Sequence, residues 1–396
     1  MASFNSPGCE LMRRRVLISA IHHWNSPFQV GSHAFAREWA RLGWDVAYVS
    51  APLTPLHRCL PQDEDLRRRR ANHQAGGEFD AKTGVWHYVP YALVAPDLRF
   101  PLERACVLKY WQLSAMPALM PLLQRQGFEQ VDVLFLNSAF QPFWLQAMPH
   151  RHSVYRVADL NSGFGGFGRS AQGVEQSLIR QVDCVVAAAH CLHQPLVSMG
   201  AKQVAVIPNG IDPSVFTQPQ PRPQEYLMHS GPIAVYVGAF GPWFDFHLLH
   251  ACATELPWLQ FVLIGPLNAD RLVARLPNIQ VLGSRPQHKV AGYLQHADVG
   301  IIPFDREGHP DLVNHVHPLK LYEYCAAGLP VVSSYWDELA AFDHPARLCR
   351  DATQFQAALI ELVRSTHDAQ TLRQFAQSNN WQSRLQALLP MLGVRE

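Results

Sequence analysis

The sequence has few charged residues and almost no net charge. Of its 396 residues, 16% are charged and 48% are hydrophobic, and the formal net charge is +1 at pH 7. This composition is typical of a globular chain rather than a disordered one. A net charge near zero gives no electrostatic footprint for nucleic-acid binding. Because the length is sufficient for two ordinary domains, we expect a folded two-domain protein that does not bind nucleic acid.

The sequence also lacks paired cysteine spacing and long apolar runs. Its eight cysteines contain no Cys-x-x-Cys pair, and Cys184, Cys252 and Cys325 lie in apolar stretches, which is typical of reduced core residues. No run approaches the roughly 18 apolar residues of a membrane span. The apolar run Val16–Ile21 is too short for an export signal. These absences predict a cytoplasmic location, with residues 1–12 as a loose tail.

Strand-like and helix-like stretches alternate along most of the chain. Residues 16–50 have the pattern of a strand, a helix and a second strand with short links, which is the βαβ unit of a parallel sheet. Five prolines between 213 and 232 mark a linker, after which the alternation resumes. The sequence therefore predicts an α/β fold of two Rossmann-like, doubly wound domains that face each other across a cleft. The predicted parts are an N-terminal domain at 13–212, the Pro-rich linker at 213–232, a C-terminal domain at 233–370, and a helix at 371–396 that returns to the N-terminal domain.

Three stretches of the N-terminal half have ambiguous patterns. Residues 63–65 contain an Asp-x-Asp that runs into four arginines, and we expect a solvated, self-paired loop. Residues 93–126 mix apolar and basic residues, which fits either a segment on an anionic membrane or an ordinary helix packed on the sheet; we favour the packed helix. Residues 163–168 match G-x-G-x-x-G, but they follow a late strand, so we predict a ligand-facing loop rather than an NAD site.

The sequence HPLKLYEYCAAGLPVVS at 317–333 predicts a helix whose first turn could bind a ligand. The helix should begin after Pro318 and end at Gly328. Its N-terminal N–H groups can bind an anion, and Lys320 in the first turn would oppose the helix dipole unless an anion lay there. Glu323 lies one turn further on. The pair fits a diphosphate and a ribose diol, and the residues alone leave open a solvated Lys–Glu pair.

Three stretches of the C-terminal half resemble GT-B glycosyltransferases, including family 4-like enzymes. They are VGAFGPWFD at 237–245, NIQVLGSRPQHKVAGYLQHADVGIIPF at 278–304, and HPLKLYEYCAAGLPVV at 317–332. The resemblance implies that a glycine loop faces the donor diphosphate, that Lys320 contacts this diphosphate, and that Glu323 contacts ribose or sugar hydroxyls. The donor-side candidates are Gly238, Phe240, Arg285, His317, Lys320, Leu321 and Glu323. The histidines near 317 match no standard zinc ligand set, and no metal is expected.

The N-terminal half resembles the acceptor domain of the same enzymes. The glycine-containing loop at 28–32 would border the cleft, with His22, Gly31 and His33 as the acceptor-side candidates. Many retaining members carry a glutamate at the position of His315. The chain is more similar to the membrane-associated glucuronosyltransferase branch of bacterial exopolysaccharide synthesis, which inverts the anomeric centre and uses an Asp in a Tyr-Arg-x-x-Asp context. Residues 155–159 match that context, which implies Asp159 as the general base; a cap or turn role is the alternative.

These resemblances imply a metal-independent, inverting transfer of a sugar from a UDP-sugar, with glucuronate as a candidate sugar. The expected acceptor is a glycan or a lipid-linked saccharide, and no cofactor is expected. The cytoplasmic face of the inner membrane is a further candidate partner. Three alternatives stay open: a retaining transferase that uses another nucleotide sugar such as GDP-mannose, a sugar-nucleotide epimerase, and a binder without catalysis.

Overall fold

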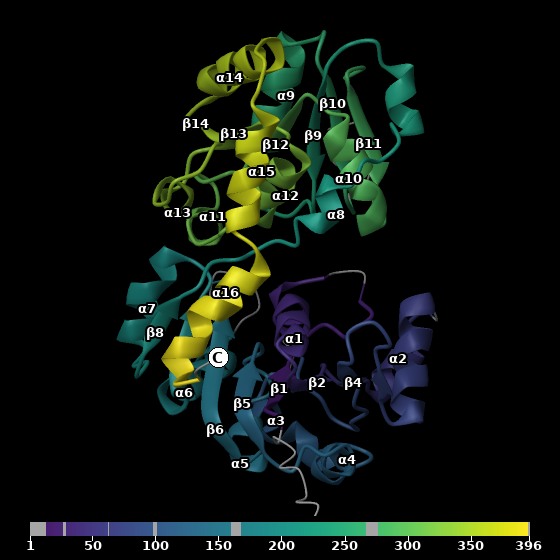
Figure 1. The fold of residues 1–396 in the computed structure, drawn as a ribbon, viewed down its shortest axis with the longest axis vertical. Coiled ribbons are helices and arrows are strands. Elements are labelled where there is room, and N and C mark those ends of the chain that lie inside the picture. The colour runs from purple at the N-terminus through teal and green to yellow at the C-terminus, as the bar shows by residue number, and fades with distance from the viewer. Residues whose placement is uncertain are drawn as a thin grey trace, which may run out of the picture. The chain divides into compact units, whose positions relative to one another are not determined.

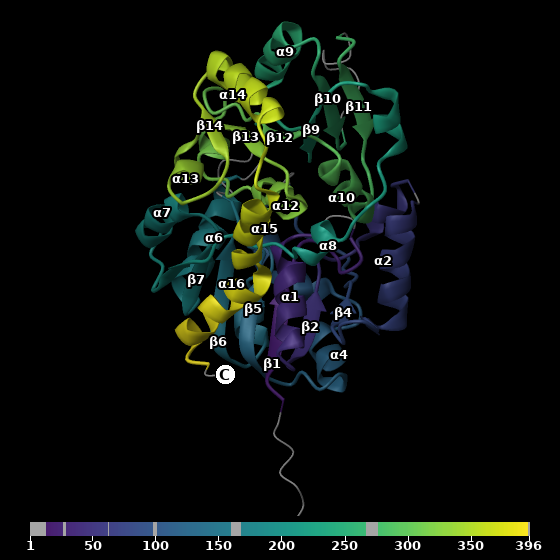
Figure 2. The same ribbon diagram turned by 45° about the horizontal axis from the view of Figure 1, so that its top comes forward.

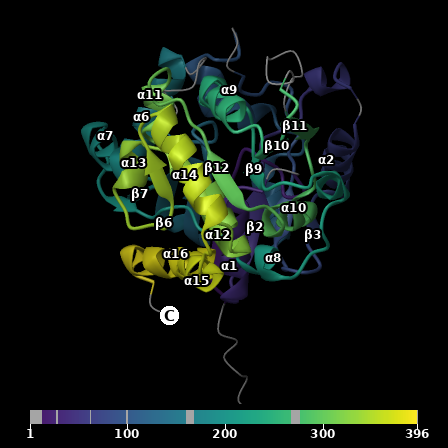
Figure 3. The same ribbon diagram turned by 90° about the horizontal axis from the view of Figure 1, so that it is seen from above.

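The computed structural model describes residues 13–26, 29–61, 63–97, 101–159, 168–266 and 276–394. The chain divides into two compact units. One unit consists of residues 1–156 and 168–183, and the other of residues 157–167 and 184–396. The ribbon is shown in three orientations (Figures 1, 2 and 3). The predicted tail at 1–12 and most of the glycine-rich loop at 163–168 lie outside the described residues.

The first sheet has the strand order β3-β4-β2-β1-β5-β6-β7-β8 among the described residues. The pairs β1–β2, β1–β5, β2–β4, β5–β6 and β7–β8 are parallel, and only the short β3 is recorded as antiparallel to its neighbour. The bounds are β1 Arg15–Ser19, β2 Asp45–Val49, β3 Glu78–Phe79, β4 Trp86–Tyr88, β5 Val131–Leu136, β6 His150–Val157, β7 Cys184–Ala187 and β8 Val204–Val206. The inner strands β1, β2, β5 and β7 are mostly apolar and buried, as expected for parallel strands covered on both faces.

Helices and short 3₁₀ turns connect these strands. They are α1 Gly31–Arg41, a turn at Pro55–Arg58, α2 Glu64–Ala75, α3 Ala105–Tyr110, a turn at Trp111–Ser114, α4 Leu119–Arg125, α5 Trp144–Ala147, α6 Arg169–Gln181, a turn at His190–Leu192, and α7 His193–Ser198. Helix α1 shows how the sequence sets the packing. Its residues Ala34, Phe35 and Trp39 share one face and are all buried, which is the spacing typical of a helix that packs one face on the core.

The second sheet has the order β11-β10-β9-β12-β13-β14, and its paired strands are parallel. Figure 1 shows the strands side by side in this order. The bounds are β9 Ile233–Val237, β10 Gln260–Ile264, β11 Ile279–Gly283, β12 Val299–Ile302, β13 Val331–Ser334 and β14 Arg347–Cys349. The chain reverses its direction of progress across the sheet between β9 and β12. Such a reversal is where open α/β sheets bind ligands, outside the carboxyl ends of the strands.

The helices of this part form two groups. Helix α12 packs against α15, α8 and α10, whereas α14 packs against α9, and Figure 3 shows α9 and α14 next to each other. The elements are α8 Ser214–Thr217, a 3₁₀ turn at Gln224–Met228, α9 Phe246–Glu255, α10 Gln287–Gln295, α11 Pro310–Val313, α12 Leu319–Ala327, α13 Asp337–Ala340, α14 Ala352–Arg364, α15 Ala369–Ser378, α16 Trp381–Leu388, and a turn at Leu389–Leu392. Helices α15 and α16 follow each other near the C-terminus (Figure 2).

The structure confirms the α/β class with two parallel, Rossmann-like sheets, and it corrects one local prediction. The stretch at 63–70 is not a loop, because α2 begins at Glu64. Asp63 caps this helix by accepting a hydrogen bond from the Leu66 N–H at 2.8 Å, and Glu64 pairs with Arg68 one turn on. A capping acid and an i,i+4 ion pair stabilise a helix even when too few apolar residues are present to show its period. The predicted domain boundaries stay predictions.

Residues 93–126 form short helices rather than one long one. Helix α3 packs against α6, and Leu108 and Trp111 are buried, as the packed interpretation predicted. Leu113 and Met116, by contrast, are 81% and 53% exposed. Within the described part of the chain, no helix has the length and apolar character needed to cross a membrane.

Candidate functional site

The ammonium group of Lys320 lies in an aromatic niche at the carboxyl ends of β9 and β12. Its Nζ is 5.3 Å from the ring centroid of Tyr236 and 5.6 Å from that of Phe304. Tyr236 belongs to β9, and Phe304 follows β12. Electron-rich ring faces attract a cation and hold it in one direction. The niche therefore fixes the charge of Lys320 at the point where the second sheet reverses its strand order.

The loop after β9 passes directly beneath Lys320. A Cβ atom added to Gly238 would lie 2.4 Å from the Lys320 Cε and 2.6 Å from Nζ, and Gly238 has a φ of +150°. Gly265, after β10, has a φ of +154°, and its added Cβ would lie 1.9 Å from the Gly238 carbonyl oxygen. Only glycine fits such close approaches at these angles. The structure thus brings together Gly238 and Lys320, two of the predicted donor-side residues.

The N-terminus of α12 adds a second positive feature. Pro318 stands at the N-cap position, and no side-chain cap bond is present there. The first N–H groups of a helix without such a cap remain available for an anion. Leu321 is fully buried in the core, so its side chain cannot face a ligand, and its contribution is limited to the backbone N–H. The predicted anion site therefore consists of this helix start and Lys320.

Lys320 and Glu323 are both only partly exposed, and each affects the charge of the other. Burial lowers the pKa of Lys320, and the negative charge of Glu323 partly offsets this effect. Burial raises the pKa of Glu323, and Lys320 offsets that in turn. A buried charge is costly unless it is paired. An anionic ligand beside Lys320 would supply further pairing, which favours binding of a phosphate at this place.

The other predicted donor-side residues have different surroundings. Phe240 packs on Tyr236, with their ring centroids 5.1 Å apart. Arg285 is engaged by Glu225 at 3.0 Å and by the Tyr293 hydroxyl at 3.2 Å, so it would have to exchange a partner to contact a nucleotide. His317 is 3% exposed, and its ring bonds to other side chains. The structure places Gly238, Phe240, Lys320 and Glu323 around one niche and gives Arg285 and His317 protein partners.

The predicted acceptor-side residues lie around the end of β1 and the start of α1. His33 is fully buried, its Nε2 lies 3.0 Å from the His23 carbonyl oxygen, and burial lowers the pKa of His33 to about 4. Its imidazole is therefore neutral at pH 7. His22 is partly exposed, and burial lowers its pKa as well. A Cβ added to Gly31 would lie 3.0 Å from the guanidinium of Arg156.

The Tyr-Arg-x-x-Asp segment joins this region to the end of β6. Tyr155 is buried, and its hydroxyl donates to Glu175 of α6 at 2.7 Å. Arg156 is 3% exposed and lies over the ring of Phe35. Asp159 follows β6, where it is partly buried. The tyrosine and arginine thus anchor the strand end that carries Asp159, a structural role that the motif alone did not reveal.

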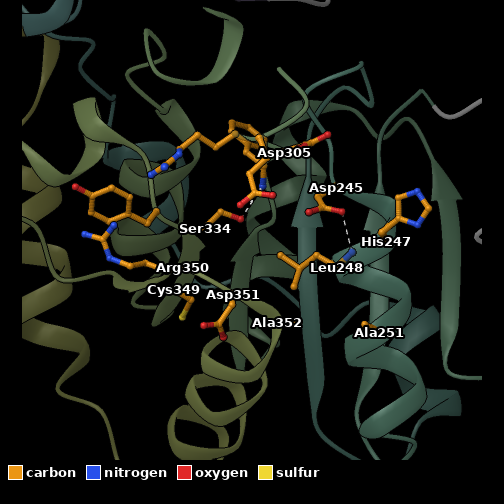
Figure 4. Close-up of a pocket in the computed structure, with 14 residues that line it drawn as sticks. Asp245, His247, Leu248, Ala251, Asp305, Ser334, Cys349, Arg350, Asp351 and Ala352 are labelled. Carbon is orange, nitrogen blue, oxygen red and sulfur yellow. Dashed lines mark hydrogen bonds between the residues drawn. The ribbon is translucent and has the colours of Figure 1, made fainter. Parts of the chain in front are cut away.

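A cavity of about 560 Å³ opens beside the niche, in the same part of the chain (Figure 4). Phe304 lines it and also contacts Lys320. Three carboxylates on its wall each accept a backbone N–H: Asp245 from Leu248, Asp305 from Gly308, and Asp351 from Gln354. The cavity wall is therefore built from caps and turns at strand ends. Within the described ranges, no group of three or more His, Cys, Asp or Glu residues could hold a metal ion.

Sequence reasoning missed the aromatic walls of the niche. Tyr236 belongs to β9 and Phe304 follows β12. Tyr324 of α12 accepts the Val237 N–H at 2.9 Å, which ties α12 to β9. The sequence did offer one signal, since Tyr236 precedes the glycine loop and Phe304 ends the "ADVGIIPF" stretch. Neither position could be assigned to Lys320 before the strand order was known.

Two family models match the chain over different ranges. Residues 17–188 match "Glucuronosyltransferase GumK, N-terminal domain", and residues 231–365 match "Glycosyl transferases group 1". TuaH of Bacillus subtilis (strain 168), a protein assigned as a teichuronic acid biosynthesis glycosyltransferase, is 24% identical over 249 residues. That match covers 57% of this chain and 60% of TuaH, so the chain spans less than two thirds of this relative.

Solved structures share the fold over nearly the whole chain. Sucrose-phosphate synthase from Thermosynechococcus elongatus has a TM-score of 0.65 and 17% identity, with 96% of both chains covered. Anabaena Alr3699/HepE, solved in complex with UDP, has a TM-score of 0.64 and 15% identity, with 96% of this chain and 99% of that chain covered. The similarity to these solved structures shows the fold of the whole chain, whereas each family model matches one of two separate ranges of the sequence. The chain therefore has the GT-B fold, and each of its two matched ranges is similar to a glycosyltransferase family model.

Proposed function

We propose that this protein transfers a sugar from a UDP-sugar to a glycan or a lipid-linked saccharide. The observation that carries the proposal is the Lys320 ammonium held over Gly238 at the start of α12. A diphosphate in this niche would gain a cation and backbone N–H groups. Glu323, one helical turn away, is suited to accept hydrogen bonds from ribose or sugar hydroxyls. The UDP complex of the Anabaena structure supports uridine as the nucleoside of the donor.

In the proposed reaction, the acceptor oxygen attacks the anomeric carbon and the bond to the diphosphate breaks. Asp159 would take the proton of the attacking hydroxyl, as a general base does. The leaving UDP develops negative charge on its terminal phosphate, which Lys320 and the helix start would stabilise. We propose that this stabilisation suffices without a metal ion. One attack on the face opposite the leaving group inverts the anomeric centre.

We propose that the transferred sugar is glucuronate, so that the donor is UDP-glucuronate. Two similarities support it: the match of residues 17–188 to the N-terminal domain of a glucuronosyltransferase, and the assignment of TuaH to teichuronic acid biosynthesis. The Tyr-Arg-x-x-Asp segment supports the inverting course in the same way. A cytoplasmic location also belongs to the proposal.

A donor panel tests this function. We expect purified protein to release UDP from UDP-glucuronate in the presence of a saccharide acceptor, faster than from UDP-glucose or GDP-mannose. The anomeric configuration of the product, read by NMR, should be inverted relative to the donor. Conversion of the nucleotide sugar without any acceptor would favour the epimerase instead. Retention of configuration would remove the role of Asp159 as base.

An exposed apolar cluster suggests how a membrane-bound acceptor is reached. Leu93, Val94, Leu113 and Met116 are all at least 42% exposed, and backbone bonds from Leu93 to Ser114 and from Met116 to Tyr91 hold them together. We call these four residues the apolar cluster. Arg104 lies at the N-cap of α3 and Lys109 in its last turn, shortly before Leu113 in the sequence. Apolar side chains flanked by cations favour binding to an anionic lipid surface.

Replacing Leu113 and Met116 by serine should lower the partition of the protein onto vesicles that contain phosphatidylglycerol by at least about tenfold, because burying a large apolar side chain contributes roughly 1.5–3 kcal/mol. Cosedimentation measures this partition. The matched control is Leu227→Ser with Met228→Ser, since these residues are 66% and 84% exposed but lie in the 3₁₀ turn at Gln224–Met228. Equal loss in both double variants would contradict a specific role of the cluster.

A further inference from the structure

A buried carboxylate lies behind the start of α12. Glu338 of α13 is 1% exposed. Its Oε1 accepts the His190 N–H at 2.9 Å, and its Oε2 accepts the Cys191 N–H at 3.0 Å. Glu338 thereby holds the turn that follows β7. A fully buried carboxylate persists only where several donors compensate for its lost hydration.

The same carboxylate holds His317, the residue before Pro318 and α12. The His317 Nδ1 lies 3.2 Å from the Glu338 Oε1, and its Nε2 bonds to the Tyr322 hydroxyl. A carboxylate can only accept, so Nδ1 carries the proton and Nε2 accepts from Tyr322. Arg384 of α16 also bonds to Tyr322. A chain of polar contacts thus runs from α16 through α12 and His317 to α13.

The backbone of the segment before α12 is fixed by three further bonds. The Asn209 amide donates to the His317 carbonyl at 2.9 Å, the Trp336 indole donates to the Val316 carbonyl at 3.0 Å, and the Cys191 thiol donates to the Asn314 carbonyl at 3.3 Å. Trp336 is itself fully buried. Glu338 bonds to both the histidine and the turn that carries Cys191, and is therefore the common partner of these contacts.

We infer that Glu338 is a positioning residue for donor binding: through His317 it fixes the start of α12, and with it Lys320, without touching the donor. The inference rests on the proposed function, because it concerns the diphosphate site of that function. Glutamine at 338 would keep the shape, but its NH₂ group would replace an acceptor and would face an N–H donor or His317 Nδ1. The start of α12 would then lose part of its constraint, and the precise placement of a binding group is what sets its affinity.

The ionisable groups around His317 should make the affinity for the donor depend on pH. Burial lowers the pKa of His317, and Glu338 partly offsets this effect. The groups that face the imidazole are Glu338, Tyr322, Arg384, His190 and His344. Protonation of Nε2 would turn it from an acceptor into a donor, so the Tyr322 hydroxyl could no longer donate to it and would have to reorient, which would disturb the start of α12. Donor binding should therefore weaken as pH falls, and loss of Glu338 should move this weakening to lower pH.

The test is UDP affinity by isothermal titration calorimetry across pH 4.5–8 on the full chain. We expect Glu338→Gln to raise the Kd for UDP about tenfold at pH 7.5 and to move the acid limb of the binding profile to lower pH. The control is Glu361→Gln, which removes a half-exposed carboxylate paired with Arg347 on the surface and should change neither quantity. Ionisation of UDP affects all variants equally and cancels in the comparison.

A second variant can test the inference even if Glu338→Gln does not fold. Asn209→Ala removes the amide that donates to the His317 carbonyl, and we expect the Kd to rise about three- to fivefold. An unchanged Kd and acid limb in a folded Glu338→Gln protein, or in Asn209→Ala, would overturn the inference and leave the proposed function standing. Failure of the unsubstituted protein to bind UDP would overturn the proposed function and this inference together.

Discussion

Asp159→Asn should lower the rate of sugar transfer by about 10²- to 10⁴-fold, the usual contribution of a general base, while UDP binds as before. The amide keeps the size of the side chain and removes its ability to take a proton from the acceptor hydroxyl. The position of Asp159 directly after β6, anchored by Tyr155 and Arg156, makes a large structural change from this substitution unexpected. Single-turnover transfer and UDP titration on the same preparation separate the two quantities.

The control for this substitution is another aspartate near β6. Asp183 precedes β7 and accepts from the Ser153 N–H and hydroxyl, so Asp183→Asn removes a comparable charge and hydrogen bonds without touching the proposed chemistry. Its transfer rate per folded molecule should stay within about twofold of the unsubstituted protein. If Asp159→Asn transferred sugar at a similar rate, the assignment of the base would be wrong. If it lost UDP binding as well, Asp159 would have a binding role instead.

Apolar periodicity predicted most of the fold because buried strands and amphipathic helices must follow it. The strand, helix and second strand predicted within residues 16–50 are β1, α1 and β2. Helix α2 escaped prediction because capping and ion pairing stabilise it, and neither leaves an apolar period. The short α11 and α13 escaped for a related reason. Four-residue helices are too short to show a period at all.

The candidate site residues that lie on one helix could be predicted from the sequence. Those that are brought together by the order of the strands could not. Lys320 and Glu323 share α12, so their spacing along the sequence already placed them on adjacent turns. Glu338 and Phe304 reach the same helix only through the order β9-β12-β13, which a local pattern does not contain. For His317 the sequence was misleading. Its position close to Lys320 in the sequence suggested contact with a ligand, whereas its ring is buried against Glu338 and Tyr322.

Lys320→Met should raise the Kd for UDP about 10- to 150-fold, because one charge-assisted hydrogen bond contributes about 1.5–3 kcal/mol. Methionine has nearly the length of the lysine side chain and fits an aromatic niche, so the niche between Tyr236 and Phe304 stays filled. Glu323 would lose the cation that offsets the effect of burial on its pKa. We therefore expect the loss in affinity to be greater for UDP than for uridine, which lacks the diphosphate. Isothermal titration calorimetry with both ligands measures this difference.

Gly238→Ala tests the same niche while the positive charge is kept. The added methyl would occupy the space of the Lys320 Cε and Nζ, at a φ of +150° that alanine rarely adopts. The ammonium must then move, and UDP affinity should fall in the same range as for Lys320→Met. Lys289→Met and Gly173→Ala are the matched controls, because Lys289 is exposed and an added Cβ at Gly173 meets no atom within 4 Å.

A loss of UDP affinity in Lys320→Met without one in Gly238→Ala would mean that the charge matters but its placement over the glycine loop does not. Loss in both, with uridine binding retained, would locate the diphosphate between this loop and α12.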